Sequence, residues 1–489
     1  REILIEKLPY QNILLQGRNE IKILQRELNK KRRIMPLRKL FQSIPNLLLT
    51  LKPCLMMSPL TVSLFLESNQ FNFDTVIFDE ASQVCTENAI GAISRGKQVI
   101  LAGDSKQLPP TTFFTATISD PEYDEEDKDD YTDIDSYESI LDEAESSLFP
   151  SQTLEWHYRS RHEHLIAFSN SKIYNNKLIT FPSNIEKSKD NGVEYIYVEN
   201  GIYDRGGKKD NIEEARKVVD IIFESLRLNP SRSLGVITFS VSQHETIETV
   251  LRKERLKSPA YDDYFNEDKD EPFFIKNIET VQGDERDTII FSIGYGKDSA
   301  GKMSMFFGPL SSTGGERRLN VAITRAKHNV KLVGSILPTD IKTERITSEG
   351  PKLLRSYIEF AIHGPTVLKN EIIANESNQI ESPFEQSIFD FLVQKGYKIS
   401  TQIGCSGYRI DMGIHNPKDY SSYCLGIECD GTTYHSARTA RERDRLRQTI
   451  LEDMGWKIYR IWSTDWIRNT ENEKHRLLEA VNNAITQST

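Results

Sequence analysis

Two short apolar runs, each ending in acidic residues, mark the first quarter of the chain. The runs FDTVIFDE (residues 73–80) and KQVILAGD (97–104) have the β-branched composition of buried strands, and ENAIGAIS between them has helical spacing. This strand–helix–strand order predicts a parallel sheet with carboxylates at its active edge. The preceding ILQRELNKKRRIMPLRKLF predicts helices, whose basic side chains either face a nucleic acid or form a solvated surface.

Apolar periodicity predicts two further α/β regions. SLGVITFS, DTIIFSIGY and NVKLVGS are strand candidates of the middle region. The last region predicts a helix (PFEQSIFDFLVQKG), the strands YKISTQI, RIDMGIH and CLGIECDG, a helix over 437–454, the strand WKIYRIWS and a closing helix. The predicted organisation is therefore a first domain (1–118), an acidic mobile insertion (119–149), a second domain (150–345), a linker (346–380) and a C-terminal domain (381–489).

The acidic balance of the chain comes largely from one segment. The net charge is −10, but residues 120–145 contain 14 Asp or Glu against one Lys, which leaves +3 on the rest. A nucleic-acid partner is therefore not excluded. Five cysteines without a CxxC pair indicate a reducing, cytoplasmic setting, and no apolar run reaches the roughly 20 residues of a membrane span, so we expect no membrane partner.

The two acidic strand ends have the chemistry of a nucleotide-hydrolysing site. At such an end Asp79 can hold Mg²⁺ through water, and Glu80 can orient a water toward a γ-phosphate. In the second strand end, Gln107 follows Gly103 and Asp104 in LAGDSKQLPP, where it can sense a phosphate.

Five segments in order resemble motifs II to VI of superfamily 1 helicases. They are FDEASQ, LAGDSKQLPP, LEWHYRSRHEHLIAFSN, IETVQGDERDTIIFSIGY and RRLNVAITRAK, and they are most similar to the group containing the nonsense-mediated-decay helicase and the DNA replication helicase-nucleases. The resemblance implies two RecA-like parallel-sheet domains, the first incomplete, that use ATP and Mg²⁺. It assigns Asp79 to Mg²⁺, Glu80 as catalytic base, Gln107 to the γ-phosphate, Gly283 and Glu285 to the neighbourhood of the nucleotide, and Arg159 and Arg325 as arginine fingers.

A phosphate-binding loop is missing from these motifs. No GxxxxGK[ST] occurs, and the spacing in DRGGKKDN does not fit one. In this helicase group the loop precedes motif II, so we expect it upstream of the first residue. The hypothesis is that the full protein hydrolyses ATP whereas these 489 residues alone do not.

The last hundred residues contain a second acidic constellation. Glu428 and Asp430 alternate along one predicted strand and therefore share a face, and Asp411 on a neighbouring strand can join them around Mg²⁺. Such a metal can activate water for phosphodiester cleavage.

This domain resembles the PD-(D/E)XK endonucleases, in particular the very-short-patch-repair branch. The resemblance rests on the αβββαβ order, on D…ExD and on ECDGTTYH followed by RERDRLRQTILEDMGWKIYRIWSTDW. It implies a C-terminal α/β restriction-endonuclease-like domain. Asp430 stands where the family has a lysine, and His435 is the candidate for proton transfer or water positioning.

Three other features of this domain have two interpretations each. Glu385 in SPFE is either a metal ligand, as the resemblance implies, or part of a capping box. Five arginines between residues 438 and 447 either hold DNA phosphates or pair with interleaved acids, while Leu446, Ile450 and Met454 are predicted to pack inward. The tryptophans at 456, 462 and 466 are predicted to be core aromatics rather than base-stacking platforms.

The predicted function is an ATP-driven DNA helicase or translocase fused to a Mg²⁺-dependent DNA endonuclease. Such fusions resemble bacterial genome-defence enzymes. The alternatives are an RNA helicase and a helicase whose C-terminal domain is catalytically inactive and only docks on DNA.

Overall fold

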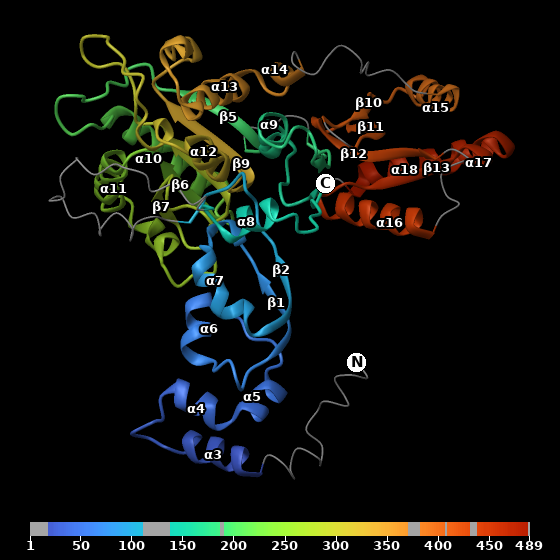
Figure 1. Ribbon diagram of the computed structural model, residues 1–489. Helices are drawn as coiled ribbons and strands as arrows, with labels where there is room; N and C mark the ends of the chain where they lie inside the picture. Colours follow the sequence, from blue (N-terminus) through green and yellow to red (C-terminus); the bar gives the residue numbers. More distant parts are fainter. Residues whose placement is uncertain are drawn as a thin grey trace. The chain divides into compact units, whose positions relative to one another are not determined.

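The structure, a computed structural model, describes residues 18–110, 137–185, 190–369, 382–405, 408–430 and 438–487 (Figure 1). The chain divides into two compact units, residues 1–152 and 153–489, and each unit is described by itself. None of the helices in the described ranges combines the length and apolarity that a membrane span requires.

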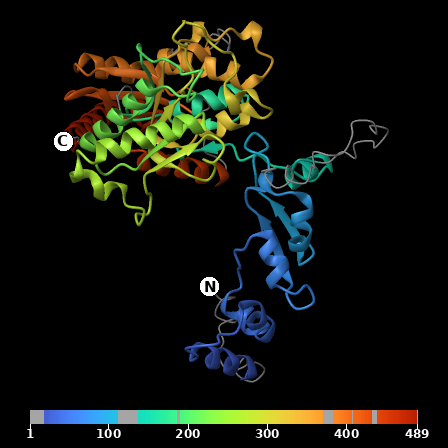
Figure 2. The ribbon, with the colours of Figure 1, turned by 90° about the vertical axis from the view of Figure 1, so that its left-hand side faces the viewer.

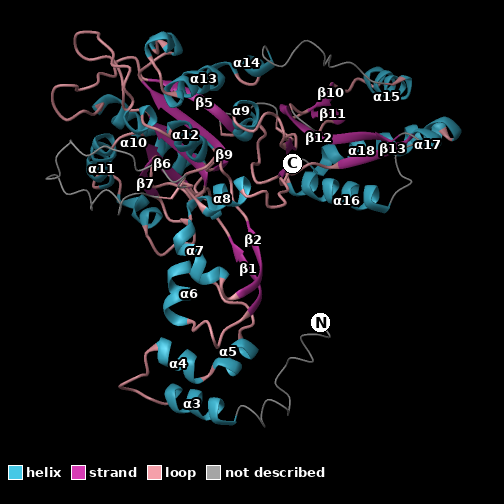
Figure 3. Cartoon of the chain, viewed as in Figure 1, coloured by secondary structure: helices cyan, strands magenta, loops and turns pink. Residues whose placement is uncertain are grey.

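The N-terminal unit contains the predicted strand–helix–strand element. Strands β1 (Phe73–Phe78) and β2 (Gly96–Leu101) pair in parallel and are joined by helix α7 (Thr86–Ile93) (Figure 3). The predicted helices before them are also present. They are α3 (Arg18–Leu28), α4 (Leu37–Ser43), α5 (Pro45–Leu51) and α6 (Pro59–Phe65).

Part of the segment predicted to be a mobile insertion is a packed helix instead. Helix α8 (Ile140–Ser146) begins at Ser139, whose side chain accepts the amide of Asp142 and caps the helix. Ile140, Leu141 and Ala144 are buried with Phe78 in one apolar cluster. The acidic composition favoured an unpacked segment, but three apolar residues on one face of α8 are enough for this helix to pack against the sheet. Residues 111–136, the rest of the acidic segment, lie outside the described residues.

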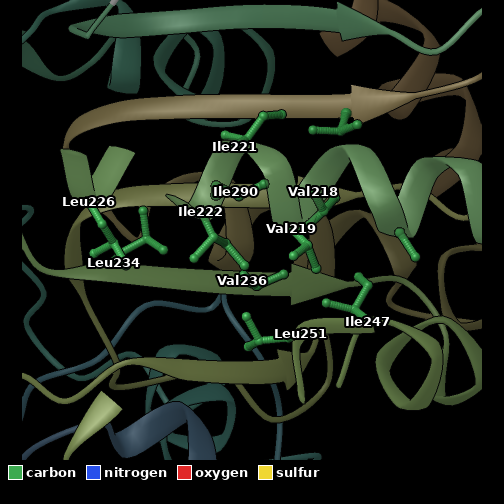
Figure 4. Close-up of a cluster of buried hydrophobic side chains, with 12 residues drawn as sticks. Val218, Val219, Ile221, Ile222, Leu226, Leu234, Val236, Ile247, Leu251 and Ile290 are labelled. Carbon is green, nitrogen blue, oxygen red and sulfur yellow. The ribbon is translucent and has the colours of Figure 1, made fainter. Parts of the chain in front are cut away.

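The C-terminal unit contains a five-stranded parallel sheet of order β5-β9-β8-β6-β7. Its strands are β5 (Gly192–Tyr197), β6 (Leu234–Thr238), β7 (Phe274–Asn277), β8 (Arg286–Ser292) and β9 (Ala326–Gly334). Helices α10 (Ile212–Leu228) and α11 (Val241–Arg255) cover one face, and Figure 2 shows the green α10 in front of the sheet. Valines, leucines and isoleucines of α10, α11, β6 and β8 fill the layer between helices and sheet (Figure 4).

Helices α9 (His164–Lys172) and α12 (Gly315–Ile323) complete the body of this sheet domain together with α13 (Glu349–His363). Helix α13 lies in the segment 346–380, for which the sequence pattern predicts a helix followed by a linker. Its Tyr357 and Phe360 are buried against the ring of Phe168 in α9, so the helix belongs to the core. Helix α14 (Thr366–Lys369) follows, and residues 370–381 lie outside the described residues.

The C-terminal domain is a four-stranded mixed sheet of order β10-β11-β12-β13. Strands β10 (Ile399–Ile403), β11 (Ile410–Asn416) and β12 (Asp419–Asp430) are antiparallel, and β13 (Ile458–Trp462) runs parallel to β12. Helices α15 (Pro383–Gln394), α17 (Ser463–Arg468) and α18 (Thr470–Gln487) share one apolar cluster with the sheet. Helix α16 (Arg438–Asp453) contributes to a second cluster, and its side chains are described from Arg445 onward.

This domain packs on the five-stranded-sheet domain through the segment that contains the short strands β3 (Trp156–His157) and β4 (Ile179–Thr180). The ring of Phe181 joins the second apolar cluster. Around it, Arg161 donates to the main-chain oxygen of Asp453 (2.6 Å), and the Trp456 indole donates to that of Pro182 (2.8 Å). The contact therefore has both an apolar centre and a polar border.

Candidate active sites

The carboxyl ends of β1 and β2 bring the first two helicase-like motifs together. The amide of Ala102 donates to the oxygen of Phe78 (2.8 Å), and the amide of Ala81 donates to the oxygen of Ala102 (2.9 Å). Gly103 is required for this close approach, because a Cβ there would lie 3.1 Å from the nitrogen of Ala81. Asp79 and Glu80 therefore leave the sheet beside the second acidic turn.

Glu80 occupies a backbone conformation that is unfavourable for its residue type. Its φ of 51° is left-handed, a region that non-glycine residues enter at a cost of about 1–3 kcal/mol. The side-chain amide of Gln83 donates to the Glu80 carboxylate (3.3 Å), and the side-chain amide of Gln107 donates to the Asp104 carboxylate (3.0 Å). Backbone strain of this kind is often found at functional sites, where the orientation of a side chain is kept at a cost in the stability of the fold.

In the C-terminal unit, the structure brings Arg159 and Glu285 together. Nη2 of Arg159 lies 2.5 Å from Oε2 of Glu285, and Nζ of Lys327 lies 3.3 Å from the other carboxylate oxygen. Gly283, two residues earlier, has a φ of 85°, which favours glycine strongly over residues with a Cβ. Two predicted nucleotide-site residues thus adjoin one predicted arginine finger.

Arg325 lies in a different environment from Arg159. Its side chain is buried, its Nε donates to the oxygen of Val321 (2.8 Å), and Nη2 donates to Thr324 (3.3 Å). The guanidinium therefore closes the C-terminal end of α12. Its role as an arginine finger stays a prediction.

Histidines on either side of Arg159 are uncharged at neutral pH. Burial, followed by the nearby charge of Arg159, lowers the pKa of His157 to about 4, and burial lowers the pKa of His162 to about 4. His157 is hydrogen-bonded to the hydroxyl of Ser160 (2.9 Å). The positive charge of this segment therefore comes from its arginines.

A buried carboxyl group, Glu214 of α10, was not predicted from the sequence. It accepts hydrogen bonds from the hydroxyl of Ser292 (2.8 Å) and the amide of Gly294 (2.6 Å), both at the carboxyl end of β8. Burial raises the pKa of Glu214 to about 8 in spite of these hydrogen bonds, so the group is largely protonated at neutral pH. Only the helical spacing of EEARKVVDII, which places Glu214 on the same face as the buried apolar residues, could have indicated this buried carboxyl group.

The predicted nuclease carboxylates lie on neighbouring strands. Met412 of β11 pairs with Ile427 of β12, so Asp411 and Glu428 are adjacent across the sheet, and Asp430 follows on the face of Glu428. The Asp411 carboxylate accepts the amide of Cys429 (2.7 Å), which fixes its position against β12.

Two residues that sequence reasoning missed contact Glu428. Arg460 of β13 pairs with Glu428 in register, and its Nη2 lies 3.0 Å from Oε2 of Glu428, while Nη1 lies 3.9 Å from Oδ2 of Asp430. The hydroxyl of Tyr408 donates to the other oxygen of Glu428. A cation and a phenol therefore hold this carboxylate on both sides.

Glu385 lies in the first turn of α15, where it contacts the N-cap residue Ser382. The hydroxyl of Ser382 accepts the amide of Glu385 (3.2 Å) and donates to its carboxylate (2.7 Å). Burial, followed by the charges of Asp411, Glu385, Asp430 and Glu428, raises the pKa of the Cys429 thiol. Glu428 and Asp430 point to the opposite side of the strand, and Glu385 as a metal ligand stays a prediction.

Three predictions about packing in this domain are settled by burial. Ile450 and Met454 are buried as predicted, but Leu446 is 53% exposed, and Leu451 takes the inward position because the helical face runs through residues 447, 450, 451 and 454. Trp456 and Trp466 are core residues, whereas Trp462 is 40% exposed because it ends β13 beside Asp430. His435 lies outside the described residues, as do the side chains of Arg438, Arg441 and Arg443.

The oxygen donors of this site suit a hard cation, but Glu428 and Asp430 contact the Arg460 guanidinium. Asp411, Glu428 and Asp430 offer the oxygen ligands that Mg²⁺ prefers. Among the described residues, however, no three His, Cys, Asp or Glu side chains are grouped so that they could hold a metal ion. Asp411, Glu428 and Asp430 as metal ligands stay a prediction.

Comparison with known proteins agrees with this division of the chain. Residues 51–115 and 137–337 match two families described as AAA domains, and residues 384–481 match the restriction-endonuclease-like family REase_MTES_1575. The chain carries superfamily 1 helicase domains and a restriction-endonuclease-like domain. The predicted fold class, RecA-like parallel sheets with a mixed-sheet C-terminal domain, is confirmed.

Named relatives support the helicase domains. The uncharacterized ATP-dependent helicase MG140 homolog of Mycoplasma pneumoniae is 31% identical over 85% of this chain and 37% of its own length. The corresponding Mycoplasma genitalium protein is 31% identical over 81% and 36%, and the uncharacterized ATP-dependent helicase MJ0104 of Methanocaldococcus jannaschii is 26% identical over 59% and 40%. The chain thus spans less than half the length of each of these relatives.

Proposed function

We propose that the protein is an ATP-driven DNA helicase or translocase whose C-terminal domain is a Mg²⁺-dependent DNA endonuclease. The observation that carries the nuclease part is the placement of Asp411, Glu428 and Asp430 on two adjacent strands of a restriction-endonuclease-like sheet. The motor part is supported by the matched helicase domains and by relatives named as ATP-dependent helicases. A role in genome defence rests on the resemblance of such fusions alone.

In the proposed motor, Asp79 holds the metal of the nucleotide through water and Glu80 orients the attacking water. Arg159 neutralises charge on the transferred phosphoryl group, for which its planar guanidinium is suited, and this requires release from Glu285. The 489 residues contain no GxxxxGK[ST] sequence, and the proposal assigns no residue of this chain to the phosphate-binding loop.

In the proposed nuclease, Asp411, Glu428 and Asp430 would hold Mg²⁺, which when bound supplies Lewis acidity and lowers the pKa of a coordinated water. The reaction joins a water oxygen to phosphorus and breaks one P–O ester bond. A protein base takes the proton of the water, and the leaving oxygen is protonated from solvent. The Cys429 amide orients Asp411, and the Tyr408 hydroxyl orients Glu428 for these tasks.

Nicking of supercoiled plasmid by this chain in Mg²⁺ or Mn²⁺ tests the nuclease proposal. We expect metal-dependent nicking that is abolished by EDTA, by Asp411→Ala and by Glu428→Ala, while Asp419→Ala on the far end of β12 leaves it unchanged. Matched RNA substrates decide between the two polymers. Equal cutting by the wild type and the Glu428→Ala variant would reject the assignment.

A second candidate is a catalytically inactive domain that only docks the motor on DNA. The ion pair between Arg460 and Glu428, together with the lack of a metal-holding group among the described residues, favours it. Under this alternative the chain binds duplex DNA with no cutting in any divalent metal.

A further inference from the structure

We propose that Arg460 is a catalytic residue of the nuclease site that contacts the phosphodiester and takes the role of the family's missing lysine; this inference rests on the proposed nuclease function. Asp430 stands at the position of that lysine, so the strand that carries Glu428 offers no cation of its own. The neighbouring strand supplies one.

The parallel register places Arg460 where a cation is needed. β12 and β13 pair Glu428 with Arg460 and Asp430 with Trp462, so the Arg460 side chain leaves the sheet on the same face as both carboxylates. Its Nη atoms lie 3.0 Å from Glu428 and 3.9 Å from Asp430. The guanidinium is thus within one side chain's reach of any phosphate that these carboxylates would help to bind.

The contacts of Arg460 indicate that its ion pair is exchangeable. The side chain is 23% exposed, so the guanidinium is not sealed into the core. Its Nε is buried without a hydrogen-bond partner within the described residues. Among the described residues, its ion-pair partners are Glu428 at 3.0 Å and Asp430 at 3.9 Å, and a phosphate can offer the guanidinium two parallel hydrogen bonds in their place.

The charge of the site supports the same exchange. Three carboxylates face a polyanion, which is repulsive unless cations are present between them. Without metal or DNA, Arg460 offsets one of the negative charges of Glu428 and Asp430. When DNA binds, the guanidinium turns to the non-bridging oxygens and neutralises the charge that grows there as water attacks phosphorus and the ester bond breaks. It remains protonated throughout, so the proton of the water goes to another base.

If Arg460 binds phosphate, its replacement should lower DNA cutting and DNA affinity but not metal affinity. If it only supports Glu428, its replacement should lower metal affinity as well. In Arg460→Gln we expect cutting to fall about 100-fold or more, as when one charge-stabilising donor is removed from an active site. In Arg460→Lys the charge remains but the fork is lost, so we expect an intermediate rate. Mn²⁺ affinity measured by calorimetry should be unchanged or higher in Arg460→Gln, because a competing cation next to Glu428 has gone.

The matched control is Arg468→Gln, an exposed arginine of α17 in the same domain, which should cut at the wild-type rate. Duplex affinity, measured in Ca²⁺ to prevent cutting, should fall in Arg460→Gln relative to this control. Cutting within threefold of wild type by Arg460→Gln overturns the proposal, and so does a parallel loss of Mn²⁺ affinity and thermal stability, which would mark a structural role.

Failure of the nuclease proposal itself gives a different pattern. In that case the wild type, Arg468→Gln and Glu428→Ala all show no metal-dependent nicking. The phosphate contact is then judged on duplex affinity alone. Equal affinity of Arg460→Gln and Arg468→Gln for DNA refutes it.

Discussion

Glu214 predicts an unusual pH dependence for the parallel-sheet domain of the C-terminal unit. Its pKa in the folded protein is about 8, whereas an exposed glutamate in an unfolded chain titrates near the reference value of 4.5. The folded state therefore holds a proton that the unfolded state has already lost between these two pH values. Stability from this group is fully present below about pH 4.5 and is lost as the pH rises through about 8.

The size of the effect follows from the difference between the two pKa values. Each pKa unit corresponds to about 1.4 kcal/mol, so the loss between pH 4.5 and pH 8 is of the order of 4 kcal/mol. Burial followed by the charge of Glu214 raises the pKa of Tyr195, so this phenol stays neutral over this range. Glu214→Gln removes the ionisable proton but keeps an oxygen that can accept from Ser292 and Gly294.

Hydrogen exchange followed by mass spectrometry can measure this. After correction for the intrinsic rate, peptides from α10 and β8 of the wild type should lose about 100-fold in protection between pH 5.5 and pH 8, which corresponds to about 3 kcal/mol. Glu214→Gln should lose little. The control Glu213→Gln, at the adjacent half-exposed position, should follow the wild type. Identical pH profiles for Glu214→Gln and the wild type would refute the reasoning.

Three further predictions concern packing. Trp456→Ala removes a buried indole and its hydrogen bond to the helicase domain, so we expect a loss of about 3–5 kcal/mol, seen as early proteolysis of the C-terminal domain on heating. Ser382→Ala removes the N-cap of α15 and should cost about 1 kcal/mol in the exchange protection of that helix alone; an unchanged α15 would count against it. Gly235→Ala brings a Cβ within 2.5 Å of the Phe274 ring and should lower the melting temperature, whereas Gly206→Ala, where nothing lies within 4 Å, should not.

The central strands of the parallel sheet could be predicted from sequence, but its edge strands could not. β6 and β8 are buried along almost their whole length and read as nearly continuous apolar runs. The edge strands β5 and β7 carry Glu194 and Lys276, which interrupt that pattern. In the structure Glu194 pairs with Lys331, which is distant in sequence, and Lys276 pairs with Asp284 in the loop before β8. Because paired charges interrupt the apolar pattern of the edge strands, that pattern did not predict them.

The same limit applies to the candidate nuclease site. Asp411, Glu428 and Asp430 could be proposed because alternate positions on a strand share a face. Arg460 could not, because only the register between β12 and β13 reveals that it lies opposite Glu428. Motif spacing identifies groups on one strand, whereas partners on a neighbouring strand depend on pairing that the sequence does not specify.

The shared apolar cluster around Phe181 has a consequence for how these domains can be inherited or engineered. Phe181 comes from the helicase domain, whereas Tyr423, Met454 and Trp456, which pack with it, come from the restriction-endonuclease-like domain. Separating the domains at residue 381 would leave aromatic surface exposed on both pieces. The nuclease-like domain therefore cannot be moved to another protein by itself. Its transfer requires a recipient whose own segment supplies an equivalent aromatic ring, or the transfer of residues 153–489 as one block.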